Sequence, residues 1–279
     1  MCARWTTGFW GFMSDPDLAF KLADGWQKRG VERGATLLLH SSAKRTLKFF
    51  DIHPAELIRS FLHALGPEGT LLLPVFNFGW CRGEPFDIRS TPGETGVLGN
   101  TAMQWPGAAR TPHPVYGAMV LGRHAQTWRD RTAPSTADTG EGYGRSSIFG
   151  WLHHVGGTIG VLDLDDQSSQ TSYHYIEQCA GAHWRHHKFW RGQYTDENGE
   201  TTLREYSIYV RNEGIQTNVN PMGELLWRAG LYQGDRPHVG SGLRTIKAAA
   251  MYDAVTPIVS AIRQGAADHR LLFLRNEVA

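Results

Sequence analysis

The sequence predicts an α/β protein with a mainly parallel central sheet covered by helices and a more irregular α+β C-terminal half. Two observations support this class. Continuous apolar runs at residues 35–40 and 70–76 indicate strands that are buried on both faces, as in parallel sheets. Between them, the apolar spacing of residues 54–65 indicates a helix, which supplies the crossover that two parallel strands need.

The other elements follow from turn residues and apolar spacing. A first helix begins at Asp15 and Pro16, an N-cap followed by proline, and ends at Gly30. The second half is expected to contain strands at 117–122, 158–163 and 203–211 and helices at 147–154, 171–184, 221–229 and 256–264. In the last helix, Pro257 is expected in the first turn, where its missing N–H is tolerated.

The length of 279 residues is consistent with one large domain, which we expect over 1–279. Within it, residues 1–33 are expected to form a leader and the first helix. Residues 34–170 form an α/β half, and residues 171–279 form the C-terminal half. No internal repeat divides the sequence further.

The composition restricts location and partners. With 28 Lys and Arg against 27 Asp and Glu, the formal net charge is +1, so no overall field attracts nucleic acid or an anionic membrane. Three widely spaced cysteines fit neither a disulfide framework nor a zinc site, which indicates a reducing, cytoplasmic location. No apolar run approaches the ~20 residues of a membrane span. We therefore expect no nucleic acid and no membrane as a partner, and we leave a homodimer open.

Familiar nucleotide-binding and catalytic motifs are missing from the sequence. There is no G-x-x-x-x-G-K-[ST], no G-x-G-x-x-G that opens a helix after a strand and no G-x-S-x-G. These absences disfavour a P-loop NTPase, a Rossmann dehydrogenase and an α/β-hydrolase. His183, His186 and His187 lie close together, but their spacing matches no zinc motif, so we predict no metal site.

Four segments, taken in order, carry a resemblance to a known family. They are Leu39-His40-Ser41-Ser42, Gly66-Pro67-Glu68-Gly69-Thr70-Leu71, Arg110-Thr111-Pro112-His113-Pro114 and Thr171-Ser172-Tyr173-His174-Tyr175-Ile176-Glu177. This set resembles the aminoglycoside 3-N-acetyltransferase family. The resemblance implies an α/β acyltransferase that takes an acetyl or other short acyl group from coenzyme A to an amine of an aminoglycoside or other amino sugar. It also implies that residues 34–170 bind acetyl-CoA and that residues 171–279 carry the catalytic helix.

Acyl transfer to an amino sugar needs a base, because the amine is largely an ammonium ion at neutral pH. A histidine suits this task, and we expect His174 to be that base. The resemblance pairs this histidine with a glutamate about thirty residues downstream, a place that Glu205 occupies, while Glu177 competes for the role. Thr171 either donates its hydroxyl near the thioester carbonyl or caps the helix. Cys179 points to another helix face, which favours direct attack over an acyl-cysteine intermediate.

Coenzyme A brings phosphates that need polar partners. Small residues at the end of a parallel strand let backbone N–H groups face an anion. The first candidate contacts are His40, Ser41 and Ser42, followed by Lys44 and Arg45. The second are Ser146 and Ser147, just before a predicted helix. The alternatives are a solvated basic loop for the first group and a helix cap without a ligand for the second.

The sequence leaves the identity of the acceptor open between two kinds of amino sugar. A cationic aminoglycoside calls for carboxylates, for which Asp87 and Asp163 are candidates, and His113 between two prolines either lines the pocket or shapes the turn.

The basic and aromatic stretch at 184–191 suits phosphate charge better, with Arg185, Lys188 and Arg191 as candidate contacts. The resemblance therefore extends to family members that N-acylate amino sugars carried on a nucleotide diphosphate. An inactive sugar-binding relative is a third alternative, which the presence of both His174 and Glu205 disfavours.

Overall fold

The computed structural model describes residues 16–130, 140–169, 171–236 and 242–276. The expected leader and Asp15 lie outside these residues. The first helix, α1 (Pro16–Gln27), is confirmed, and the turn after it reaches Gly30 with a φ of 90°. None of the described helices is both long and apolar enough to cross a membrane.

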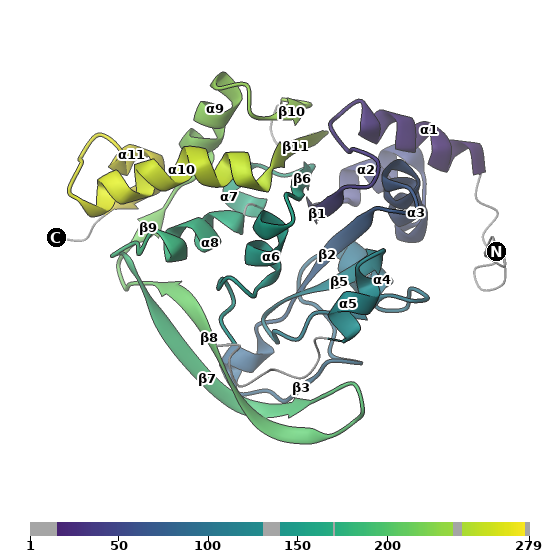
Figure 1. Ribbon diagram of the computed structural model, residues 1–279, viewed down its shortest axis with the longest axis horizontal. Coiled ribbons are helices and arrows are strands. Elements are labelled where there is room, and N and C mark those ends of the chain that lie inside the picture. The colour runs from purple at the N-terminus through teal and green to yellow at the C-terminus, as the bar shows by residue number, and fades with distance from the viewer. Residues whose placement is uncertain (1–15, 131–139, 170, 237–241, 277–279) are drawn as a thin grey trace.

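The central sheet has seven strands in the order β10-β11-β6-β1-β2-β5-β4 (Figure 1). Its three middle strands, β6 (Thr158–Leu162), β1 (Thr36–Ser41) and β2 (Thr70–Phe76), are parallel. The outer strands run antiparallel to their neighbours; they are β10 (Gln233–Gly234), β11 (Leu243–Lys247), β5 (Tyr116–Gly122) and β4 (Ala109–Arg110). The α/β class is confirmed, with parallel pairing concentrated at the centre of the sheet.

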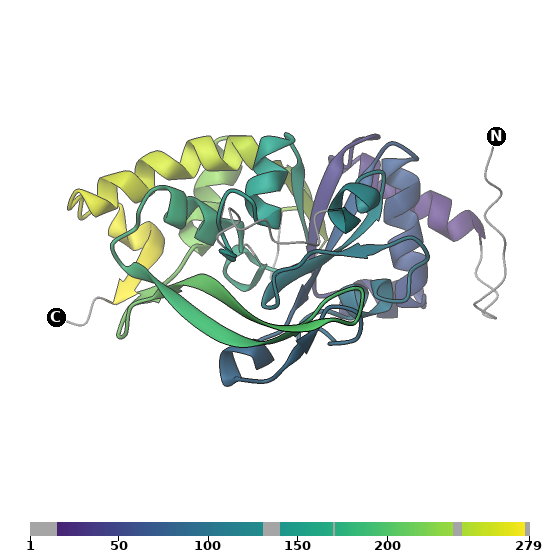
Figure 2. The ribbon, with the colours of Figure 1, turned by 60° about the horizontal axis from the view of Figure 1, so that its bottom comes forward.

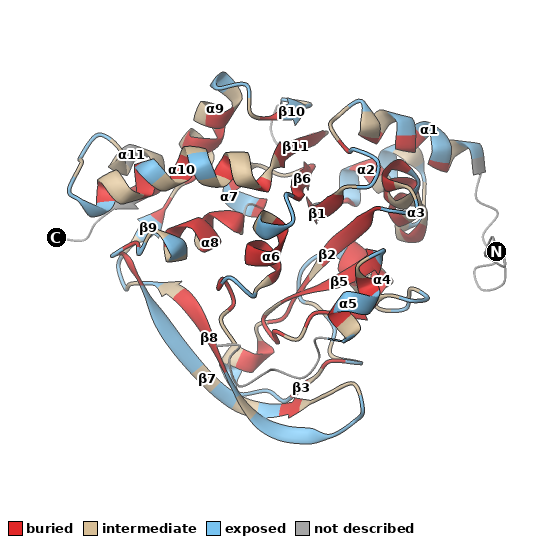
Figure 3. Ribbon diagram, viewed as in Figure 1, coloured by how far each residue is buried: buried red, intermediate tan, exposed pale blue. Residues whose placement is uncertain are grey.

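Both faces of the sheet are covered, as the continuous apolar runs predict. Side chains alternate along a strand, so Leu37 and Leu39 of β1 point to one face and Leu38 to the other. The first face packs against α1, α3 (Pro54–Leu65) and α4 (Val97–Ala102). The other packs against α6 (Ile148–His154), α8 (Ser172–Cys179) and α10 (Ala248–Arg263). Figure 3 shows β1 and β2 almost wholly buried, whereas β10 at the edge of the sheet is exposed.

A second sheet, β3-β7-β8, is built on a long two-stranded ribbon that lies across the molecule (Figure 2). β7 (Arg185–Thr195) and β8 (Thr201–Arg211) are antiparallel, and β3 (Phe86–Asp87) pairs with the end of β7. The predicted helix at 171–184 is too long, because α8 ends at Cys179 and Gly181 follows with a φ of 64°. The basic stretch is therefore a strand, whose outer surface is exposed.

The predicted place of Pro257 is wrong. It lies inside α10, which begins at Ala248, eight residues before the expected start. A proline inside a helix costs about 3 kcal/mol, mainly through a lost hydrogen bond and a clash with the preceding turn. Burial of Met251, Val255 and Val259 against the core offsets this cost. Tertiary packing thus overrides the local helix-start pattern.

The remaining elements are short and connect these layers. The helices are α2 (Lys44–Phe50), η1 (Gly79–Arg82, a 3-10 helix), α5 (Ala125–Arg129), α7 (Asp166–Ser169), α9 (Asn220–Arg228) and α11 (Arg270–Phe273). The strands β9 (Gln216–Thr217) and β12 (Leu274–Asn276) pair with each other. The predicted helices at 54–65, 147–154 and 221–229 and the predicted strands are confirmed to within a few residues.

Candidate active site

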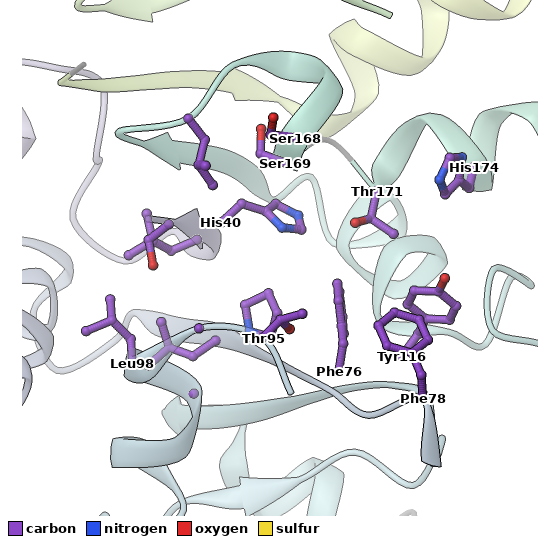
Figure 4. A pocket seen from close by; sticks show the side chains of 17 residues that line it. His40, Phe76, Phe78, Thr95, Leu98, Tyr116, Ser168, Ser169, Thr171 and His174 are labelled. Carbon is purple, nitrogen blue, oxygen red and sulfur yellow. The ribbon is translucent and has the colours of Figure 1, made fainter. Parts of the chain in front are cut away.

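Two cavities meet beside α8. The first, with a volume of about 240 Å³, lies at the carboxyl ends of β1 and β2 (Figure 4). The second, of about 500 Å³, extends toward β8 and α9. Five residues line both cavities: Tyr116, Ser168, Ser169, Thr171 and His174. His174 therefore stands where a ligand in one cavity would meet a ligand in the other.

His174 is held by a buried ion pair. One helical turn places Glu177 beside it, and its Nδ1 lies 2.8 Å from Glu177 Oε2. Arg185 Nε lies 2.8 Å from the same oxygen, and Trp184 donates its indole N–H to the other carboxylate oxygen at 2.8 Å. Arg185 Nη2, which can only donate, also lies 2.8 Å from His174 Nδ1, so Nδ1 faces one donor and one acceptor. Because the ionised carboxylate only accepts hydrogen bonds, the tautomer with its proton on Nδ1 bonds Glu177, and this tautomer leaves the lone pair of Nε2 free.

The charges around His174 favour its neutral form. Burial, followed by the charges of Arg185 and Arg211, lowers the pKa of His174 below its usual 6.5, although Glu177 acts in the opposite direction. Burial alone would raise the pKa of Glu177, but Arg185 and the hydrogen bonds from His174 and Trp184 lower it to about 2. At neutral pH the pair is therefore a carboxylate and a neutral imidazole, the states that a general base requires.

The expected pairing of His174 with Glu205 is corrected by this geometry. Glu205 lies on β8, opposite Arg191 of β7, and its side chain is exposed. Glu177 is only 1% exposed and makes the hydrogen bond to His174. The next residue on β8, Tyr206, points inward, and strand alternation therefore turns Glu205 outward.

Thr171 and His40 face the first cavity from opposite sides (Figure 4). Thr171 precedes α8, but its side chain makes no capping hydrogen bond, so its hydroxyl is available to the cavity. His40 is 5% exposed, and its Nε2 has no hydrogen-bond partner among the described residues. Burial lowers the pKa of His40 to about 4, which keeps the ring neutral.

Of the other residues expected to bind coenzyme A, the structure places one in the lining of the first cavity and the rest outside the described linings. Ser41 lines the first cavity, whereas Ser42, Lys44 and Arg45 are exposed around the start of α2 and are not among the described lining residues. Ser147 caps α6, because its Oγ accepts from the Gly150 N–H at 3.2 Å. Ser146 is exposed, and neither serine is among the described residues that line the two cavities.

The expected acceptor contacts serve the fold instead. His113 shapes its turn, since its Nδ1 accepts from the backbone N–H groups of Val115 and Tyr116 at 3.2 and 3.0 Å. Asp87 forms an ion pair with Arg89. Asp163 is absent from both described linings, as are His113 and Asp87.

Asp163 joins three separate segments. Its Oδ2 accepts from the Thr46 N–H at 3.1 Å and the Thr46 hydroxyl at 2.5 Å, which caps α2 from outside the helix. Its Oδ1 accepts from the Gly242 N–H at 2.9 Å, and its own φ is 57°, a conformation that aspartate tolerates better than alanine.

Replacing Asp163 with alanine should therefore destabilise the protein without weakening acceptor binding. We expect the free energy of unfolding to fall by roughly 1–3 kcal/mol, the cost of leaving buried donors unpaired and a helix uncapped. Urea unfolding measures this change, and Asp253→Ala on the exposed side of α10 is the control. A large rise in acceptor KM with unchanged stability would contradict this structural role.

Of the three basic residues expected to contact the acceptor, only Arg185 is among the described residues that line a cavity. Arg185 lines the second cavity, but it is tied to Glu177 and to the Tyr209 carbonyl, which accepts from Nη1 at 2.9 Å. Lys188 and Arg191 are exposed and are not among the described lining residues. Within the described parts of the chain, no three His, Cys, Asp or Glu side chains are placed to hold a metal ion.

Sequence reasoning missed several lining residues. Tyr116, Tyr143, Ser168 and Arg211 all contribute to the second cavity. The alternating sequence pattern at 203–211 indicated only that Arg211 is the last residue of a strand. A residue-by-residue register of the hairpin, which places Arg211 opposite Arg185, was needed to find it.

The fold and the site together define a class: an α/β protein with a histidine–carboxylate pair at the junction of two ligand-sized cavities. A profile of the aminoglycoside 3-N-acetyltransferase family matches residues 38–259. The chain belongs to this family, which confirms the resemblance carried by the four sequence segments.

Individual relatives agree with this assignment. Aminoglycoside N(3)-acetyltransferase IV from a Salmonella species is 37% identical over 87 residues, which span 30% of this chain and 32% of that protein. The match thus covers about a third of the curated relative. The crystal structure of aminoglycoside acetyltransferase AAC(3)-Xa has a TM-score of 0.71 at 19% identity and covers 87% of this chain and 92% of its own. A structure of AAC-IIIb with CoASH has a TM-score of 0.69 at 18% identity, with coverages of 88% and 96%. At these identities the structures establish the shared fold.

Proposed function

We propose that the chain transfers an acetyl group from acetyl-CoA to an amine of an amino sugar, with His174 as the general base. The observation that carries this proposal is the hydrogen bond between His174 Nδ1 and Glu177 Oε2 at the junction of the two cavities. Family membership and the CoASH complex of AAC-IIIb support coenzyme A as the donor.

The reaction joins the amine nitrogen to the carbonyl carbon of the thioester and breaks the carbon–sulfur bond. His174 Nε2 takes a proton from the attacking nitrogen, and that proton leaves on the coenzyme A sulfur, so that the products are an amide and a free thiol. Glu177 supports the imidazolium that forms between these steps, and Arg185 keeps Glu177 in place. Cys179 is absent from both described linings, in agreement with direct attack.

We assign the donor to the first cavity, at the carboxyl ends of the parallel strands, where α/β proteins commonly bind ligands. Thr171 and His40 face its interior, and each offers a polar group to the thioester carbonyl (Figure 4). Ser41 adds a hydroxyl at its rim. Lys44 and Arg45, exposed near this edge of β1, are suited to the phosphates of coenzyme A.

Release of free thiol from acetyl-CoA, measured with a panel of amino sugars, tests the activity. We expect amine-dependent release whose rate falls as the pH drops through the pKa of His174, because a protonated imidazole accepts no proton. Since that pKa is lowered, the midpoint of the acid limb should lie below 6.5. Sugar binding without thiol release from any amine would instead support an inactive relative.

A further inference from the structure

The second cavity has an unusual charge for a site that receives an amine. Its described lining contains two basic side chains, Arg185 and Arg211, and no carboxylate. The rest is aromatic, apolar or neutral and polar, including the side chains of Gln167, Ser168 and Tyr143. Neutral hydrogen-bonding groups and aromatic rings suit the hydroxyls and faces of a sugar.

The two arginines differ in their ion pairing. Arg185 is neutralised by Glu177, whose buried carboxylate lies 2.8 Å from its Nε. Arg211 is exposed, and no acidic side chain in the described part of the chain pairs with it. Its charge reaches the reaction centre, because it contributes to the lowered pKa of His174. The three charged residues that shift the pKa of His174 (Glu177, Arg185 and Arg211) therefore sum to one positive charge.

Arg211 lies directly opposite Arg185 on the paired strands β7 and β8. Because Glu177 already neutralises Arg185, the charge of Arg211 is the one that a bound anion would neutralise. The same positive field would repel a second or third ammonium group and would favour the neutral form of the attacking amine.

We propose that the acceptor is an amino sugar that carries an anionic group, a phosphate ester or a carboxylate, which pairs with Arg211 while the amine faces His174. This inference rests on the proposed acetyl transfer and names the acceptor for it. In this proposal Arg211 is the anion contact instead of the basic stretch at 184–191, because Lys188 and Arg191 are absent from the described lining.

Five acceptors test the proposal in the thiol-release assay: glucosamine, glucosamine 6-phosphate, UDP-glucosamine, 2-amino-2-deoxyglucuronate and kanamycin. We expect at least one anionic sugar to exceed glucosamine in kcat/KM by about tenfold or more, the gain typical of a charge-assisted hydrogen bond. Which anionic sugar leads distinguishes phosphate from carboxylate. Added salt should raise the KM of that sugar by screening the attraction.

Arg211→Gln should remove the preference. It is expected to raise the KM of the anionic acceptor about tenfold, and its thermal unfolding midpoint should stay close to that of the parent because Arg211 is exposed. Arg228→Gln removes an exposed charge from α9 and is the control. If kanamycin or glucosamine reacts best and Arg211→Gln has no effect, the inference is wrong but the proposed function stands. If no amine releases thiol, the proposed function itself fails.

Discussion

Replacing His174 with alanine is expected to lower kcat by about 10²–10⁴-fold, the usual contribution of a general base. The physical reason is that no other described side chain at the junction of the two cavities offers a neutral imidazole held by a carboxylate. Steady-state thiol release measures the loss. Binding of coenzyme A, measured by calorimetry, should change little, because most of the first cavity is unaltered.

His154→Ala provides the matched control, since this histidine is exposed at the end of α6, outside the described linings. It should retain the parent turnover. Near-normal turnover of the His174→Ala protein would remove this residue from the mechanism and would direct attention to His40, the other histidine of the first cavity.

Glu177→Gln is expected to lower kcat by about a hundredfold or more. A neutral amide cannot stabilise the imidazolium, and its N–H groups can donate to Nδ1, which would favour the tautomer with the proton on Nε2. Glu177 raises the pKa of His174, so its loss should move the acid limb of the rate profile to lower pH. Loss of a merely structural contact would lower the rate without moving this limb.

Two comparisons make the result specific to the buried carboxylate. Glu205→Gln changes an exposed glutamate on β8 and should leave both the rate and the pH profile near those of the parent. Removing one partner of a buried ion pair costs about 3–5 kcal/mol, so thermal unfolding must accompany the kinetics of Glu177→Gln. Glu177→Asp keeps the charge and should recover part of the activity. A greater loss in Glu205→Gln than in Glu177→Gln would return the carboxylate role to Glu205.

Family membership and acceptor identity are separate questions for this chain. The family is defined over residues 38–259, which include the sheet and α8. The charge of the second cavity depends on the ends of β7 and β8, where Arg185 and Arg211 meet. We expect substitutions of Arg211 to change which amine binds while leaving His174 and Glu177 in place.

Sequence patterns alone determined the features that depend on neighbouring residues. The apolar runs at 35–40 and 70–76 predicted the buried strands, because a strand covered on both faces needs apolar side chains at every position. The apolar spacing at 54–65 predicted α3 for the same kind of local reason. His174 and Glu177 are three residues apart, a spacing that places two side chains on one face of a helix.

Only the tertiary structure decided which distant side chains meet at the site. The choice of Glu177 over Glu205 depends on which face of β8 is buried, and the nearness of Arg211 to Arg185 depends on the register of the β7–β8 hairpin. Shifting that register by one residue would turn each side chain to the other face. Packing between elements also kept Pro257 within α10. Such contacts arise from the summed burial of many residues far apart in the chain, which no local pattern records.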